Sequence, residues 1–152
     1  MQLTQKETAL LKDLKGQEEL CIEKYRKYAD TACDGALKNL FSAILSAEQS
    51  HLQTVERILS GEEVMQPAAP SAVSQTFHAV PSSCPPEGKK NDAYLCRDAL
   101  AMEKHVSSLY DVSIFEFCTP ALRDTLGHIQ KEEQNHGQQL YEYLAENNMY
   151  NA

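Results

Sequence analysis

The stretches EQSH at residues 48–51 and EQNH at residues 133–136 are two copies of one Glu-x-x-His motif. They lie 85 residues apart (133 minus 48), and the same shift aligns much of the chain without a gap. Identical residues recur at many positions. In the first half they are Leu10, Asp13, Glu18, Tyr25, Cys33, Ala36, Leu37, Ile44, Glu48, Gln49, His51, Gln53 and Leu59. In the second half, in the same order, they are Leu95, Asp98, Glu103, Tyr110, Cys118, Ala121, Leu122, Ile129, Glu133, Gln134, His136, Gln138 and Leu144. The sequence is therefore an internal repeat.

Both motifs, and a glutamate upstream of each, lie on apolar stripes at helical spacing. The four stripes are Leu11, Leu14, Glu18, Cys21, Tyr25 and Tyr28; Leu37, Phe41, Ile44, Glu48, His51, Val55 and Ile58; Cys96, Ala99, Glu103, Val106, Tyr110 and Ser113; and Leu122, Leu126, Ile129, Glu133, His136, Leu140 and Tyr143. Each stripe is typical of the inward face of a bundle helix. An unpaired charge on such a face would be costly, so the ionisable groups need partners inside.

Turn residues divide the chain into two hairpins. Asp34-Gly35 and Thr119-Pro120 each interrupt a pair of stripes, and Gly61 ends the second helix. Five of the six prolines lie between residues 62 and 92, which predicts a long irregular connection. We expect one domain over residues 1–152, with a hairpin at 4–61, a Pro-rich crossover at 62–92 and a hairpin at 93–147. The fold class is all-α, a four-helix bundle of two antiparallel helical hairpins joined by that crossover.

The spacing brings the four glutamates to one height. Each glutamate is 15 residues from the cysteine at its own hairpin turn, namely Glu18 and Glu48 from Cys33, and Glu103 and Glu133 from Cys118. Each histidine lies three residues after its glutamate, on the same helix face. The predicted ligand set for two metal ions is Glu18, Glu48, His51, Glu103, Glu133 and His136. Carboxylates and imidazoles without thiolates favour iron or manganese, and zinc can occupy such a site as a substitute.

Neighbouring polar residues have plainer interpretations. His105, His128, Glu19 and Glu132 fall off the stripes, and we interpret them as flanking or solvated groups. Tyr25 and Tyr110 could be redox-active near the metals, but we favour core residues whose hydroxyls find a partner. Cys21, Cys33, Cys96 and Cys118 are interpreted as small apolar filler, and Cys84 as an exposed thiol. An odd count of five cysteines argues for thiols rather than disulfides.

Composition limits the classes of function. The 152 residues are 42% hydrophobic and carry a formal net charge of −8, with no basic stripe for nucleic acid. No apolar run reaches the ~20 residues of a membrane span, and no secretory signal is recognisable. We expect a cytoplasmic protein and a homo-oligomer such as a dimer. Two divalent cations would cancel the four internal carboxylate charges.

The order Glu, Glu-x-x-His, Glu, Glu-x-x-His resembles the ferritin-like di-iron carboxylate superfamily, which includes rubrerythrins and bacterioferritins. The segments LTQKETALLKDLKGQEEL and DAYLCRDALAMEKHVSSLYDVSIFEF, with IQKEEQNHGQQLYEYLAENNMY, are more closely similar to the spore coat F family of ferritin-like proteins from spore-forming Firmicutes. The resemblance implies that Glu48 and Glu133 bridge two metals. It also implies that Glu18 with His51 completes one metal site, and Glu103 with His136 the other.

Two departures narrow what the resemblance implies. The chain has no rubredoxin module, so peroxidase activity would need an external electron donor. Val106 stands where rubrerythrins carry a further glutamate, which argues against their redox-linked iron movement. No fifth helix follows the fourth, so we do not expect a storage shell.

Two functions therefore compete. One is an enzyme, a non-haem dinuclear oxidase or peroxidase that reacts with peroxide or dioxygen. The other is a structural spore coat protein that contacts other coat proteins and whose metals mainly stabilise the bundle. The topology also predicts that Cys33 and Cys118 lie at opposite ends and form no disulfide with each other.

Overall fold

The structure, a computed structural model, describes residues 1–64 and 77–150. These residues form four α-helices and no strand: α1 (Gln5–Thr31), α2 (Gly35–Leu59), α3 (Pro86–Glu116) and α4 (Pro120–Glu146). None of the four helices combines the length and the apolar run that crossing a membrane requires. α2 ends at Leu59, two residues before Gly61, where the sequence predicts the end of the second helix.

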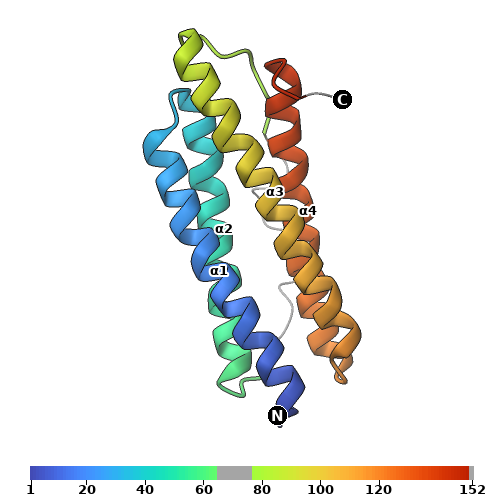
Figure 1. Ribbon diagram of the computed structural model, residues 1–152. Helices are drawn as coiled ribbons and strands as arrows, with labels where there is room; N and C mark the ends of the chain where they lie inside the picture. The colour runs from blue at the N-terminus through green and yellow to red at the C-terminus, as the bar shows by residue number, and fades with distance from the viewer. Residues whose placement is uncertain (65–76, 151–152) are drawn as a thin grey trace.

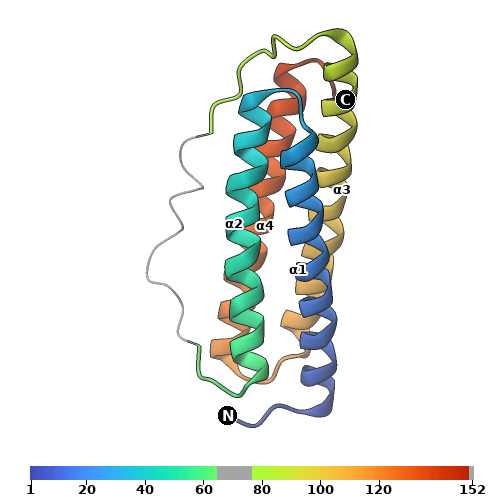
Figure 2. The same ribbon diagram turned by 90° about the vertical axis from the view of Figure 1, so that its left-hand side faces the viewer.

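The helices lie side by side, consistent with a four-helix bundle (Figures 1 and 2). α1 packs against α2 and α3 packs against α4 along their lengths, and α1 also packs against α3. The α1–α2 turn and the α3–α4 turn lie at opposite ends of the molecule (Figure 1). α2 and α3 therefore run in the same direction, as the hairpin, crossover, hairpin prediction requires.

The apolar stripes become the core. Every residue of the four predicted stripes is buried, including the six proposed ligands. Helical periodicity explains this result, because residues three and four apart share the face that each helix turns to its neighbours. Tyr25, Tyr28 and Phe41 pack at one level with ring centroids 5.3–6.0 Å apart, which fills the space between α1 and α2.

The start of α3 differs from the prediction. We expected the crossover to extend to residue 92, but α3 begins at Pro86. Proline is favoured at the first helical position, where its missing N–H has no helical partner to lose. The polar residues after Pro86 carry no apolar stripe that would reveal a helix, so the prolines were misread as part of the connection. α1, by contrast, starts at a capping box formed by Thr4 and Glu7.

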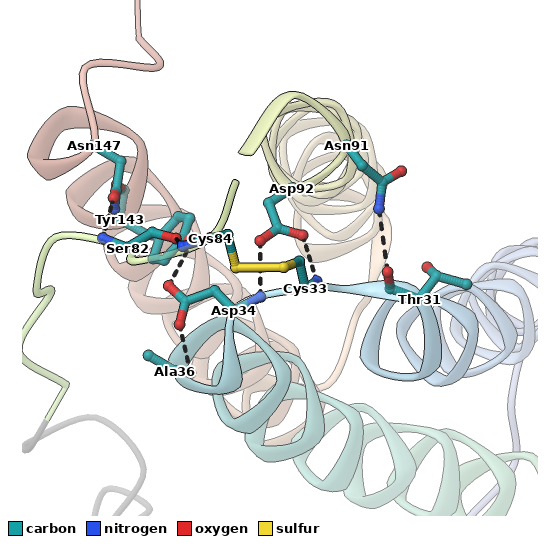
Figure 3. Close-up of a disulfide and its surroundings, with 10 residues drawn as sticks. All are labelled: Thr31, Cys33, Asp34, Ala36, Ser82, Cys84, Asn91, Asp92, Tyr143 and Asn147. Atoms are coloured by element: carbon teal, nitrogen blue, oxygen red, sulfur yellow. Dashed lines mark hydrogen bonds between the residues drawn. A yellow bond between two sulfur atoms is a disulfide. The ribbon is translucent and has the colours of Figure 1, made fainter. Parts of the chain in front are cut away.

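A disulfide between Cys33 and Cys84 joins the α1–α2 turn to the segment that precedes α3 (Figure 3). The prediction of free thiols is therefore wrong for this pair, whose Cα atoms are 6.4 Å apart. The same end of the molecule is held by Asp92, whose carboxylate accepts from the backbone N–H groups of Cys33 and Asp34 at 2.7 and 2.9 Å. The chain approaches so closely here that a Cβ on Gly88 would lie 2.7 Å from Cys33 Sγ.

The opposite end repeats part of this arrangement. Glu7 is buried and its carboxylate accepts from the backbone N–H of Cys118 at 2.9 Å. The shift of 85 relates Glu7 to Asp92 and Cys118 to Cys33, so a carboxylate near the start of each hairpin caps the loop of the other hairpin. Cys118 itself is a free, exposed thiol, which corrects its interpretation as buried filler.

Candidate metal centre

Six ionisable side chains meet in the interior, one set from each helix. α1 contributes Glu18, α2 contributes Glu48 and His51, α3 contributes Glu103, and α4 contributes Glu133 and His136. Their exposed fractions are 3% or less. These are the residues proposed from the sequence, and the structure brings all of them together.

The cluster divides into two overlapping groups. Glu18, Glu48, His51 and Glu133 form one, and Glu48, Glu103, Glu133 and His136 form the other. Within each group, one ligand atom from every residue lies within 4.8 Å of the others. Glu48 and Glu133 belong to both groups, which is the position expected of bridging carboxylates.

Both imidazoles turn the same nitrogen inward. His51 Nδ1 lies 3.3 Å from a Glu48 oxygen and 3.1 Å from a Glu133 oxygen. His136 Nδ1 lies 3.2 Å from Glu48 and 3.5 Å from Glu103. The two rings are stacked with centroids 6.0 Å apart. Nδ1 is therefore the atom that each histidine offers to the centre.

The cluster contains buried acceptors that no protein group satisfies. Within the described residues, one buried carboxylate oxygen receives no hydrogen bond in each of Glu18, Glu48, Glu103 and Glu133. The buried His136 Nδ1 also has no hydrogen-bond partner. Buried polar atoms normally find a partner, because leaving one unpaired costs about 1–3 kcal/mol. Inward oxygen and nitrogen donors without sulfur suit two hard or borderline divalent ions, so the residues present fit the dinuclear site that the sequence predicts.

The carboxylates differ in pKa. Burial raises the pKa of Glu18 and Glu103 well above the ordinary range, and the negative charges of Glu48 and Glu133 add to this effect. Burial acts in the same direction on Glu48, but the His136 and His51 imidazoles beside it outweigh burial and hold the Glu48 pKa well below the usual value. Without metal, the centre therefore reduces its repulsion by keeping protons on the terminal glutamates.

The two histidines retain protons because carboxylates surround them. Burial alone would lower the pKa of His51, yet hydrogen bonds to Glu132, Glu133 and Glu48 raise it well above the ordinary value. The pKa of His136 is also raised against burial, by the nearby carboxylates of Glu103, Glu133 and Glu48. Metal ligation requires both nitrogens to lose these protons.

The hydroxyls of two tyrosines form hydrogen bonds between the two hairpins. Tyr25 on α1 donates its hydroxyl to Glu103 on α3, and Tyr110 on α3 donates to Glu18 on α1. Both rings are fully buried. Burial and the adjacent carboxylate raise the pKa of each tyrosine, so both stay protonated donors. The expectation that these hydroxyls find a partner is confirmed, and the partners are the two terminal glutamates.

Glu132 was predicted to be solvated, and that prediction is wrong. Its side chain is 15% exposed, accepts from His51 Nε2 at 3.2 Å and lies 2.7 Å from His128 Nε2. His128 is half-buried beside it, as a flanking histidine. Under the shift of 85, Glu132 corresponds to Ala47. This outer carboxylate therefore exists only in the His51 half.

The remaining predicted roles divide by burial. His105 and Glu19 are exposed, as expected for residues off the stripes. Cys21 and Cys96 are free and buried, as expected for apolar filler. Burial raises the pKa of the Cys96 thiol to about 12. Val106 is fully buried one turn after Glu103 and offers no further ligand there.

A family model described as the Coat F domain matches residues 91–152. The match covers less than half of the chain. It includes nearly all of α3, all of α4, and the residues Glu103, Glu133 and His136. No curated protein and no solved structure is significantly similar to the chain. The match supports an association with the spore coat and says nothing of chemistry at the cluster.

Proposed function

We propose that this chain is a ferritin-like dinuclear metal protein, with two iron or manganese ions held by Glu18, Glu48, His51, Glu103, Glu133 and His136. Glu48 and Glu133 serve both ions, because they alone belong to both ligand groups. Glu18 with His51 completes one site, and Glu103 with His136 the other. The observation that carries the proposal is the set of buried, unsatisfied carboxylate oxygens facing one another across the four helices.

The activity that this centre supports best is oxidoreduction of peroxide or dioxygen. Two adjacent redox metals held there would supply the two electrons that cleavage of an O–O bond consumes, and an external donor would have to restore them. The protein's part is to hold the ligands, exclude bulk water and keep protonated groups nearby. Tyr25 and Tyr110 are buried hydroxyl donors fixed on the terminal glutamates, so protons are present at both ends of the centre.

The second candidate is a structural coat protein, and the Coat F match over residues 91–152 favours it. In that function the metals neutralise the internal carboxylates and stabilise the bundle, and other coat proteins are the partners. Metal binding is common to both candidates. Turnover of an oxidant separates them.

The test is anaerobic reconstitution with Fe²⁺ or Mn²⁺, elemental analysis, and a stopped-flow challenge with hydrogen peroxide. If the centre is dinuclear, elemental analysis should give about two ions per chain. If the protein is an oxidoreductase, peroxide should cause a rapid absorbance change that recurs when a chemical reductant is supplied. If its role is structural, metal should raise the thermal stability, and no turnover of peroxide should be seen. Failure to bind any candidate metal would refute the dinuclear centre.

A further inference from the structure

A cavity connects one side of the buried centre with the molecular surface. This cavity of about 240 Å³ lies between α2 and α4, and His51, Thr54, His128 and Glu132 are part of its lining. We call it the α2–α4 cavity. It is lined by the proposed metal ligand His51 and by Glu132, which His51 contacts.

Exposure rises along the lining of the α2–α4 cavity. Ser50 is exposed, Thr54 is half-buried, and Glu132 is 15% exposed, whereas His51 is 3% exposed. The cavity therefore extends from the molecular surface to the imidazole of His51.

The opposite side of the centre is closed. Tyr25 and Tyr110 are fully buried between α1 and α3, and each hydroxyl is occupied by a terminal glutamate. α1 and α3 are also in closer contact than α2 and α4. A species entering there would have to displace two aromatic rings, whereas the α2–α4 cavity requires no such displacement.

The lining suits a cation. Ser50, Thr54 and Thr125 carry hydroxyls, and Glu132 offers carboxylate oxygens beside the His128 imidazole. Arg57 also lines the cavity, and its positive charge is paired with Glu62 at 2.8 Å. Such oxygen and nitrogen groups can replace waters of a hydrated divalent ion step by step. The inner end presents buried carboxylate oxygens without a hydrogen-bond partner, which attract a cation through a low-dielectric opening.

We propose that the α2–α4 cavity is the route by which divalent cations enter the buried centre, and that they arrive at the Glu18/His51 group. The inference rests on the dinuclear centre proposed above. The repeat explains why entry is one-sided. The positions equivalent to Thr125, His128 and Glu132 in the other half are Leu40, Ala43 and Ala47, which offer no ligand.

The test measures the rate of metal uptake rather than activity. Metal-free protein is mixed with excess Co²⁺ in a stopped-flow instrument, and the visible absorption of bound Co²⁺ is followed to completion. Thr54→Trp places an indole ring in the cavity without changing a ligand. We expect uptake to slow by about tenfold or more, which an added barrier of about 1.4 kcal/mol produces, with unchanged final Co²⁺ content. Asn135→Trp is the control outside the cavity, because it adds the same ring at a partly exposed position of the other half, the repeat equivalent of the cavity residue Ser50.

The outcomes are separable from those of the proposed function. Absence of Co²⁺ binding by the unchanged chain would refute the centre and the entrance together. Full binding with uptake by Thr54→Trp within about twofold of the unchanged chain would refute the entrance alone. Equal slowing by Asn135→Trp would also refute it. If circular dichroism shows that Thr54→Trp does not fold, Ser50→Trp, at an exposed position, is judged by the same criteria.

Discussion

The first hairpin, α1 with α2, and the second, α3 with α4, carry identical residues at the six proposed ligand positions and at the two tyrosines that contact them. Glu18, Tyr25, Glu48 and His51 each have an identical partner 85 residues later. The contacts are equivalent too, since each tyrosine hydroxyl meets the terminal glutamate of the other half. The interior thus has approximate twofold symmetry in composition and in hydrogen bonding.

Away from the cluster the halves differ. Glu132 contacts His51, but its equivalent position is Ala47. Tyr28 donates to Asp98, whereas the equivalent Ser113 donates to a backbone carbonyl of its own helix. Cys33 is in a disulfide, and its equivalent Cys118 is a free thiol. The proposed metal ligands are therefore duplicated, whereas the contacts of Glu132, Tyr28 and Cys33 are not.

The largest expected effect tests the shared interior. Glu48→Ala or Glu133→Ala should abolish binding of both ions, because each carboxylate belongs to both ligand groups. His51→Ala should weaken mainly the site shared with Glu18, since a terminal imidazole serves one ion. Elemental analysis after reconstitution measures the loss, with the exposed His105→Ala as control. Identical loss from every substitution would contradict the division into bridging and terminal ligands.

The next effect tests the two ends of the molecule. Cys84→Ser removes a disulfide that links residues 51 positions apart. Chain entropy then predicts a loss of about 4 kcal/mol in the free energy of unfolding. Cys118→Ser, at the exposed thiol, should change it by less than about 0.5 kcal/mol. Urea unfolding without reductant measures both variants. A stability of Cys84→Ser equal to that of the unchanged chain would show that the disulfide does not constrain the protein in solution.

What the sequence could predict depended on periodicity. Glu133 and His136 fall in a run of apolar residues at helical spacing, so their inward direction follows from neighbours three and four residues away. The repeat then fixed their partners, because residues at matched distances from two turns meet at one height. Burial of all four stripes confirms this part of the analysis.

Contacts outside that periodicity could not be predicted. Cys84 lies in a Pro-rich stretch with no helical register, so nothing in the spacing indicated its approach to Cys33. Glu132 lies on the edge of α4 that borders α2, which a division into inward and outward faces does not represent. The contact of a residue at such a boundary can be predicted only when the packing of the two helices is known.

A smaller effect tests the asymmetry at Glu132. Removing an outer-sphere carboxylate typically weakens a metal site by about 10–100-fold. Glu132→Ala should therefore weaken one of two metal-binding steps, that of the His51 half, and leave the other nearly unchanged. Titration with Co²⁺, monitored by absorption, resolves the steps. Gln138→Ala, at an exposed position of the same helix, is the control. Equal weakening of both steps would mean that Glu132 acts on the whole centre rather than on His51.

The smallest effect tests whether the symmetry of the interior is energetic as well as geometric. Tyr25→Phe and Tyr110→Phe each delete a buried hydroxyl and leave the accepting glutamate oxygen without its donor. Each change should lower the free energy of unfolding of the metal-free chain by about 1–3 kcal/mol. Because the two contacts are equivalent, the two losses should agree within about 0.5 kcal/mol, the usual accuracy of additivity for independent sites. Urea unfolding provides the values, with Tyr141→Phe at an exposed ring as the control. A loss at Tyr25 alone would show that the repeated tyrosines have diverged in role, and that the asymmetry of the outer contacts extends into the core.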